Sequence, residues 1–105
     1  MKTEIKKLYW PNSKLWSKTP YVNNKRHGLQ KLYYSNGKLW YEIPYKNDLR
    51  YGIRKEYFEN GNISSETPYK NGIRHGIRKY YENGEISIYY NIYSNNIFGI
   101  RIIIK

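Results

Sequence analysis

The 105-residue chain contains no cysteine, no alanine and only one methionine. Without cysteine it has no disulfide framework and no thiolate for binding zinc or for nucleophilic attack. Residues 1–18 are too polar for the apolar segment of a signal peptide, and the longest apolar run, residues 102–104, is too short to span a membrane. We therefore expect a single domain in the cytoplasm, of a length typical for one domain.

Acidic residues are also scarce, whereas basic residues and tyrosine are abundant. Nineteen Lys and Arg against eight Asp and Glu give a net charge of +11, and the chain has 14 tyrosines. Asn, Ile, Lys and Tyr all use A/T-rich codons, so genome composition is an alternative explanation for part of the lysine content. The charge alone is thus weak evidence for a polyanionic partner, but the tyrosine content indicates a folded chain, because disordered basic segments are poor in aromatic residues.

The sequence repeats itself with a period of about 24 residues. Four units cover residues 1–28, 29–52, 53–76 and 77–99, and each ends at a glycine. Units that cannot bury enough surface alone become stable by stacking on their neighbours. The repeat predicts one domain over residues 1–105, in which residues 100–105 form a last strand that caps the fourth unit.

Each unit carries two turn signals rich in asparagine. One series occupies positions 12–13, 36–37, 60–61 and 83–84, and the other occupies 23–24, 47–48, 71–72 and 95–96. Asn and Gly tolerate the positive φ angles that two-residue hairpin turns require. Turns this frequent, flanked by Tyr, Ile, Trp and Thr, predict an all-β antiparallel meander of stacked hairpins with eight or nine strands.

Alternation along each strand assigns the side chains to two faces. Around the second repeat glycine, Leu49, Tyr51 and Ile53 share one face, while Arg50 and Arg54 share the other. We expect the apolar and tyrosine columns to form the buried side. These columns are Ile5, Leu29, Ile53 and Ile77; Tyr9, Tyr33, Tyr57 and Tyr80; Leu15, Leu39, Ile63 and Ile86; and Tyr21, Tyr45, Tyr69 and Ile92.

The unit YY-x-NG-x-L-x-x-E-x-x-Y-K-NG-x-x-x-G resembles the bacterial variant of the MORN repeat. The resemblance extends from Glu4 to Gly99 and is strongest in residues 29–76, whereas the first and last units depart from it as terminal caps do. It implies a twisted, trough-like sheet of stacked hairpins. It also implies possible roles: variants of this type are often grouped with antitoxins, and eukaryotic MORN proteins are associated with membrane phospholipids and with scaffolding of partners.

The sequence offers little for catalysis. His27 and His75 share a repeat position with aromatic residues, so we interpret them as packing residues. Glu42 and Glu66 share another position, and we expect them to form structural ion pairs with arginines of the same face. Since there is also no nucleophile elbow, metal-ligand spacing or phosphate-binding glycine loop, we expect no enzyme activity, no cofactor and no metal.

Arginines and tryptophans suggest a binding surface instead. The residues that we expect to contact a partner protein are Arg26, Arg50 and Arg74, two positions before each repeat glycine, then Arg54 and Arg78 just after it, with Trp16 and Trp40. Arginine beside exposed aromatic rings is typical of protein-interface hot spots and of platforms for single-stranded nucleic acid. The alternative is a solvated face that Arg–Glu and cation–π pairs hold in place.

The basic charge is concentrated in the first repeat. Residues 1–28 hold seven Lys and Arg and one acid, a net charge of +6. The candidate polyanion-binding residues are Lys2, Lys6, Lys7, Lys14, Lys18 and Lys25. A lysine-rich edge also protects an open sheet from edge-to-edge aggregation, and this purpose is sufficient to explain the lysines.

Together these patterns favour a non-catalytic protein-binding module. The resemblance and the small size point to an antitoxin, immunity or inhibitor-type factor that masks a toxin or effector. A phage- or plasmid-borne inhibitor of a nucleic-acid-guided nuclease belongs to the same class. The alternative is direct binding of a polyanion, either RNA or DNA or an anionic phospholipid surface.

Overall fold

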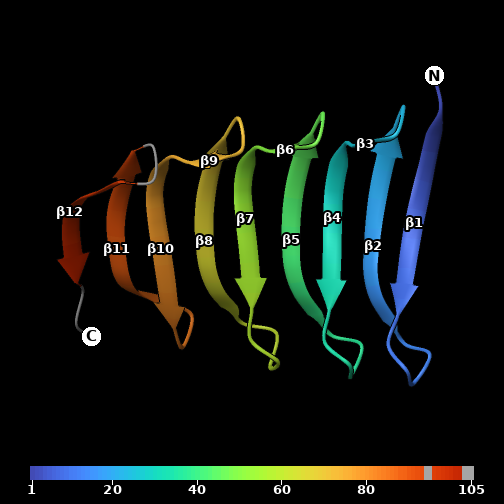
Figure 1. Cartoon of the computed structure of the whole chain (residues 1–105). Coiled ribbons are helices and arrows are strands. Elements are labelled where there is room, and N and C mark those ends of the chain that lie inside the picture. The colour runs from blue at the N-terminus through green and yellow to red at the C-terminus, as the bar shows by residue number, and fades with distance from the viewer. Residues whose placement is uncertain (94–95, 103–105) are drawn as a thin grey trace.

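The computed structural model describes residues 1–93 and 96–102, and the side chains of residues 1–92. The described residues contain no helix and form one antiparallel sheet of twelve strands. Nine strands follow one another across it in chain order, each hydrogen-bonded to the next, so that the first and last strands lie at opposite edges (Figure 1). The predicted all-β meander of stacked hairpins is confirmed.

The strands come in long and short forms. The nine long strands are β1 (Thr3–Tyr9), β2 (Leu15–Val22), β4 (Gly28–Tyr33), β5 (Leu39–Lys46), β7 (Gly52–Tyr57), β8 (Ile63–Lys70), β10 (Gly76–Glu82), β11 (Glu85–Tyr93) and β12 (Asn96–Ile102). The short ones, β3 (Lys25–Arg26), β6 (Leu49–Arg50) and β9 (Ile73–Arg74), pair only with β2, β5 and β8. The last strand thus starts at Asn96 and not at residue 100, while residues 103–105 lie outside the described part.

The two series of turns have different geometries. At positions 23–24, 47–48, 71–72 and 83–84 both residues have positive φ, as two-residue hairpin turns require. At positions 12–13, 36–37 and 60–61 only the second residue, Ser13, Gly37 or Gly61, has positive φ, and the predicted turn at 95–96 includes residue 95, which lies outside the described residues. There the loop has three residues, and the preceding asparagine accepts a hydrogen bond from the residue two positions later. The fourth repeat is one residue shorter because its loop at 83–84 is a two-residue turn.

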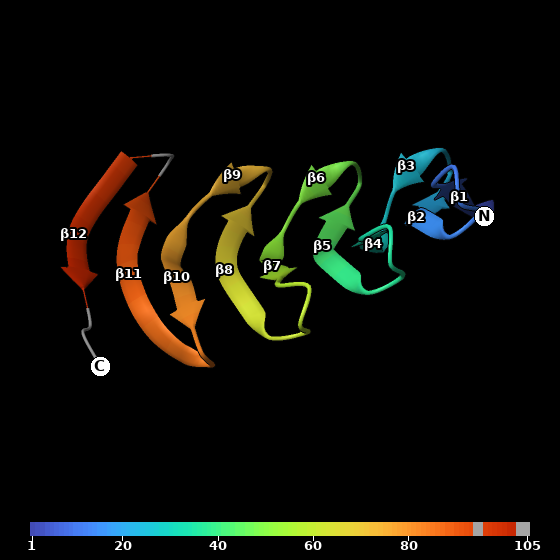
Figure 2. The same cartoon turned by 90° about the horizontal axis from the view of Figure 1, so that it is seen from below.

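The side chains on one face of the sheet are more buried than those on the other face. The buried residues among the described side chains define the inner face, and they are Ser17, Thr19, Ile43, Tyr45, Ser65, Thr67 and Ile92. The strands are bowed (Figure 2), and the whole sheet is thin, with extents of 44 × 31 × 16 Å. Because the sheet has a single layer, the inner face is covered only by its own side chains.

The predicted burial of the first aliphatic column was wrong. Ile5, Leu29, Ile53 and Ile77 are between 42% and 55% exposed, whereas Tyr45 and Ile92 are buried as expected. The reason is the strand register. Ile53 lies opposite Pro68, and its neighbour Arg54 lies opposite the buried Thr67, so Arg54 shares the inner face and Ile53 points to the outer face.

The register also corrects the tyrosine column. Tyr81, and not Tyr80, is the counterpart of Tyr57, because each donates its hydroxyl hydrogen bond to the glutamate 15 positions earlier. Tyr80 belongs to the inner face, where its ring lies 6.2 Å from that of Tyr90. The shorter turn of the fourth repeat caused the misalignment.

Two isoleucines provide a direct test of this face assignment. Ile43 is 4% exposed and Ile53 is 47% exposed, although both lie within long strands. We expect Ile43→Ala to lower the free energy of unfolding by about 3 kcal/mol, since it leaves a cavity. Ile53→Ala should cost less than about 1 kcal/mol. Urea unfolding measures both, and equal losses would contradict the assignment.

Candidate functional site

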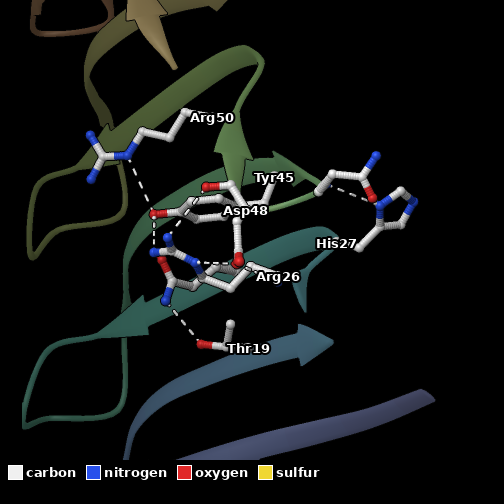
Figure 3. A network of polar contacts seen from close by, with 8 residues as sticks. Thr19, Arg26, His27, Tyr45, Asp48 and Arg50 are labelled. Carbon is white, nitrogen blue, oxygen red and sulfur yellow. Dashed lines mark hydrogen bonds and ion pairs between the residues drawn. The ribbon is translucent and has the colours of Figure 1, made fainter. Parts of the chain in front are cut away.

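Arginine and tyrosine side chains alternate across one end of the inner face, next to the short strands β3, β6 and β9 (the upper end in Figure 1). The Arg26 guanidinium lies 4.4 Å from the centre of the Tyr45 ring, and its Nη1 donates to the Tyr45 hydroxyl at 3.3 Å. Arg50 donates through Nε to the same hydroxyl at 3.4 Å and through Nη1 to the Tyr69 hydroxyl at 3.2 Å. Both arginines therefore converge on Tyr45 (Figure 3). We call Arg26, Tyr45, Arg50 and Tyr69 the arginine–tyrosine ladder.

The repeat itself builds this ladder. In each two-residue hairpin the arginine of the short strand lies directly opposite a tyrosine, as in the pairs Tyr21–Arg26, Tyr45–Arg50 and Tyr69–Arg74. Opposite residues of an antiparallel pair share a face, so Arg74 also belongs to the inner face. Arg26 reaches the tyrosine of the next repeat, and Arg50 reaches the tyrosines of its own repeat and of the next one. The ladder combines planar cations and aromatic rings in a row that the turns hold in place.

Arg54 and Arg78 lie nearer the middle of the same face. The Arg54 guanidinium is 5.4 Å from the Tyr41 ring centre, and that of Arg78 is 4.8 Å from the Tyr80 ring centre. Their Nε atoms are buried and have no hydrogen-bond partner among the described residues, and the same holds for the hydroxyl of Thr67. Aromatic rings rather than carboxylates thus position these two cations.

The tryptophans gather at the opposite end of the strands. Trp40 stacks on Tyr34 with ring centres 5.3 Å apart, and it lies 4.9 Å from the Tyr41 ring. Trp16 lies 5.9 Å from Trp10. A bulge, one extra residue in the strand, occurs at Trp16 and at Trp40. Trp40 is thus linked to Arg54 only indirectly, through the Tyr41 ring, and Trp16 lies with Trp10 at the first loop. The structure does not gather the predicted tryptophans and arginines into one cluster.

Asp48 is a site residue that the sequence did not single out. Its Oδ1 accepts hydrogen bonds from the Arg26 backbone N–H at 2.7 Å and from Arg26 Nε at 3.1 Å. These donors, the backbone N–H first and the guanidinium next, lower the pKa of the Asp48 carboxyl group. The available signal was its uniqueness, since it is the one aspartate of the chain and occupies a turn position that is Asn24 or Gly72 in the neighbouring repeats.

The lowered pKa makes a pH-dependent prediction. Because folding lowers the Asp48 pKa below its ordinary value of 3.8, the ionised carboxylate stabilises the fold above that pH, and this contribution disappears as the pH falls through the folded-state pKa. We expect Asp48→Asn to lower the melting temperature at neutral pH and to have a progressively smaller effect as the pH falls below 3.8. Glu82→Gln, at an exposed turn, is the charge-matched control. A difference that does not change with pH would contradict the role of the carboxylate.

The predicted lysine site is not one cluster. Lys6 lies on the inner face, 4.6 Å from the Tyr21 ring centre, while Lys14 reaches the Asn36 carbonyl at a loop. Lys25 lies in β3 and Lys2 precedes β1. Of the six candidates, only Lys7 and Lys18 lie opposite each other, on neighbouring strands of the outer face. Lys31, which sequence reasoning missed, lies on the same face, opposite Lys18 on the next strand, β4.

The outer face explains why these lysines stand out. Beyond Lys31, glutamates alternate with lysines across the sheet in the order Glu42, Lys55, Glu66 and Lys79. Lys18 occupies the glutamate position of the first repeat, so three lysines follow one another without an acid. The expected pairing of Glu42 and Glu66 with arginines was wrong, because the register places these glutamates on the opposite face.

The two glutamates are instead bound by tyrosine hydroxyls. Tyr57 donates to Glu42 at 2.6 Å, and Tyr81 donates to Glu66. Burial, followed by the hydrogen bond to Glu42, raises the pKa of Tyr57 to about 12. These contacts link neighbouring repeats and account for the glutamates structurally.

The histidines were also misassigned. His27 and His75 are exposed, so the predicted packing role was wrong. Each is the single residue between a short strand and the following long strand, and its backbone N–H donates to Pro20 or Pro68 of the preceding strand. Among the described residues no group of three or more His, Cys, Asp or Glu could hold a metal ion, and no helix there could cross a membrane.

The fold and this surface define the class: a single-layer β repeat protein with a row of arginines and aromatic rings on one face. The sequence model of one family, described as the MORN repeat variant, matches residues 5–23, 26–47 and 50–71, more than half of the chain. The chain therefore belongs to the MORN repeat variant family. No curated protein sequence matches it.

Proposed function

We propose that the protein is a non-catalytic binding module whose inner face docks on a partner protein and masks it, as an antitoxin, immunity or inhibitor-type factor does. The observation that carries this proposal is the arginine–tyrosine ladder, in which each guanidinium is oriented by a ring or a hydroxyl. Arginine and tyrosine contribute most to protein interfaces because they combine a large contact area with directed hydrogen bonds. A ladder that is already ordered loses little side-chain entropy on binding.

Several features support a protein partner over a nucleic acid for this face. Ladder arginines are held among tyrosines on a sheet, and Asp48 and Glu56 lie on the same side, where they would repel a phosphate backbone. Mixed charge beside aromatic rings favours a protein surface with acidic and apolar parts.

The alternative, polyanion binding, has its own observation. Lys7, Lys18 and Lys31 lie in register on three adjacent strands of the outer face. Three such lysines attract phosphate groups of RNA, DNA or a lipid surface, and each neutralised phosphate of B-DNA steepens the dependence of log affinity on log salt by about 0.9. This second site lies on the opposite face, so the two functions can be separated by mutation.

Two charge-matched triple variants test the proposal. Arg50→Gln/Arg54→Gln/Arg78→Gln and Lys7→Gln/Lys18→Gln/Lys31→Gln each remove three positive charges, from opposite faces. The variants and the wild type are immobilised, after circular dichroism confirms that they fold, and exposed to extract of the producing cells. We expect a partner protein that the wild type and the lysine variant retain and the arginine variant loses. A bound species that is nucleic acid, and that only the lysine variant loses, would favour the alternative.

A further inference from the structure

One hydrogen-bond pattern recurs where a two-residue turn meets a residue about one repeat length earlier in the chain, and we call each such place a junction. The Asn23 backbone N–H donates to the Lys2 carbonyl at 2.7 Å, and the Asn23 Oδ1 accepts from the Lys2 N–H at 3.0 Å. One repeat later, the Asp48 N–H donates to the Arg26 carbonyl at 2.9 Å, and its Oδ1 accepts from the Arg26 N–H at 2.7 Å. In both cases a turn residue with positive φ places a side-chain oxygen against the backbone N–H of a residue 21 or 22 positions earlier, which is Lys2 within the first repeat and Arg26 across the boundary between the first and second repeats.

The third junction keeps the backbone part of this pattern and lacks the side-chain part. The Gly72 N–H donates to the Arg50 carbonyl at 2.8 Å, as Asp48 does to Arg26. Glycine has no side chain, so position 72 provides no oxygen for the Arg50 N–H. The Arg50 guanidinium makes its hydrogen bonds to the Tyr45 and Tyr69 hydroxyls and not to a carboxylate.

A hollow lies at this junction. It has a volume of about 310 Å³ and is lined by Arg26, Tyr45, Asp48, Leu49, Arg50 and Gly72. Arg26 and Asp48 form an ion pair at 3.1 Å, so they largely neutralise each other. Arg50 is then the charge of the lining that no carboxylate in the hollow balances, and Leu49 provides an apolar wall.

We propose that this hollow, the Arg50 site, binds a carboxylate from an acidic residue of the partner protein. The carboxylate takes the place beside Arg50 that the Asp48 carboxylate has beside Arg26, so that one oxygen accepts hydrogen bonds from the Arg50 backbone N–H and from Arg50 Nε. Arg50 Nε then gives up its long 3.4 Å hydrogen bond to the Tyr45 hydroxyl. That hydroxyl still accepts the hydrogen bond from Arg26 Nη1. The inference rests on the proposed function, because it names the group that the partner presents.

The contacts between Arg26 and Asp48, at the junction where the carboxylate is present, favour a carboxylate over a neutral amide. The donors at Arg26 hold Asp48 in its ionised form, as its lowered pKa shows. A hydrogen bond with an ionised partner is about twice as strong as one between neutral groups, and a carboxylate beside a guanidinium adds the attraction of opposite charges. The side-chain amide of asparagine could accept the same hydrogen bonds, but it carries no net charge and so lacks the ion–ion attraction to the guanidinium.

A graft of the missing carboxylate gives a sharp test. Gly72→Asp should fill the site from within, since Asp48 tolerates the equivalent backbone with φ of 69° and Gly72 has φ of 82°. The new Cβ would lie 3.3 Å from Leu49 Cδ2, an exposed side chain that can move aside. Arg50→Gln is the second variant, which removes the cation and leaves the backbone unchanged.

The probe is N-acetyl-aspartate methylamide, titrated into the ¹⁵N-labelled full chain and followed by the amide signals in NMR spectra. We expect a saturable shift of the Arg50 N–H signal in the wild type. The affinity should fall at least about tenfold for Gly72→Asp, for Arg50→Gln and for the asparagine analogue of the probe. In unliganded Gly72→Asp the Arg50 signal should already lie downfield, where the Arg26 signal lies.

Three outcomes would overturn the proposal. They are an Arg50 signal that does not respond to the aspartate probe, a response that Gly72→Asp leaves unchanged, and tighter binding of inorganic phosphate than of the carboxylate. If one of these outcomes occurred while the protein still captured its partner, and the capture depended on Arg54 and Arg78, only the Arg50 site would be refuted. A normal titration with no partner captured would refute the proposed function and leave the carboxylate site in place.

Discussion

Replacement of Tyr45 by alanine is expected to lower the free energy of unfolding by about 4 kcal/mol. Tyr45 is 5% exposed, its ring carries the Arg26 guanidinium at 4.4 Å, and its hydroxyl accepts from both Arg26 and Arg50. Alanine removes the one aromatic ring that is buried among the side chains of residues 1–92, and it leaves two arginines without their common acceptor. A loss of this size is a large fraction of the 5–15 kcal/mol, roughly, that stabilises a typical domain.

Two further variants separate the ring from the hydroxyl. Tyr45→Phe keeps the ring and should cost about 1 kcal/mol, the usual net value of a lost hydrogen bond. Tyr51→Ala, six positions on and 45% exposed, should cost less than about 1 kcal/mol. Urea unfolding measures all three. If Tyr45→Ala cost no more than Tyr51→Ala, the inner face would not be the core of the protein.

Gly76→Ala is expected to cost about 3 kcal/mol and to lower the melting temperature by about 12–20 °C. Gly76 has a φ of +119°, which side-chain-bearing residues rarely adopt, and an added Cβ would lie 2.9 Å from Pro68 Cγ. The proline ring is rigid, so the strand must move. The same arrangement occurs at Gly28, where the Cβ would lie 3.0 Å from Pro20 Cγ.

Gly61→Ala is the matched control for this prediction. Gly61 also has positive φ, +93°, but nothing lies within 4 Å of its added Cβ. It should therefore show the backbone penalty alone, about 1 kcal/mol. The double variant Gly76→Ala/Pro68→Ala should recover about 1 kcal/mol of the loss as coupling between neighbours. Equal decreases in melting temperature for Gly76→Ala and Gly61→Ala would show that the contact with Pro68 does not cause the larger loss.

The fold could be predicted because its signals are local. Each turn depends on residues that tolerate positive φ, and Asn47, Asn71 and Gly72 adopt such φ where the sequence placed two-residue turns. A turn every 11–13 residues leaves an antiparallel meander as the simplest connection. The arginine positions were also predictable, because one arginine recurs before each of three repeat glycines.

The assignment of faces could not be predicted in the same way. We placed Ile53 inside because it is apolar, but in a single-layer sheet the register decides which residues face each other. The three-residue loops and the bulge at Trp40 set that register, and neither is visible from alternation along one strand. The Arg26–Asp48 contact joins residues 22 positions apart across a repeat boundary, so no motif within one repeat reveals it.

Covalent footprinting of the complex tests the central claim, that the inner face is the binding surface, most directly. Arginines are modified with phenylglyoxal and lysines by acetylation, with and without the captured partner, and the adducts are quantified by mass spectrometry. The account predicts that the partner protects Arg26, Arg50 and Arg54 while Lys7, Lys18 and Lys31 react as in the free protein. Protection of the three lysines with the arginines still reactive would contradict it and would place binding on the outer face.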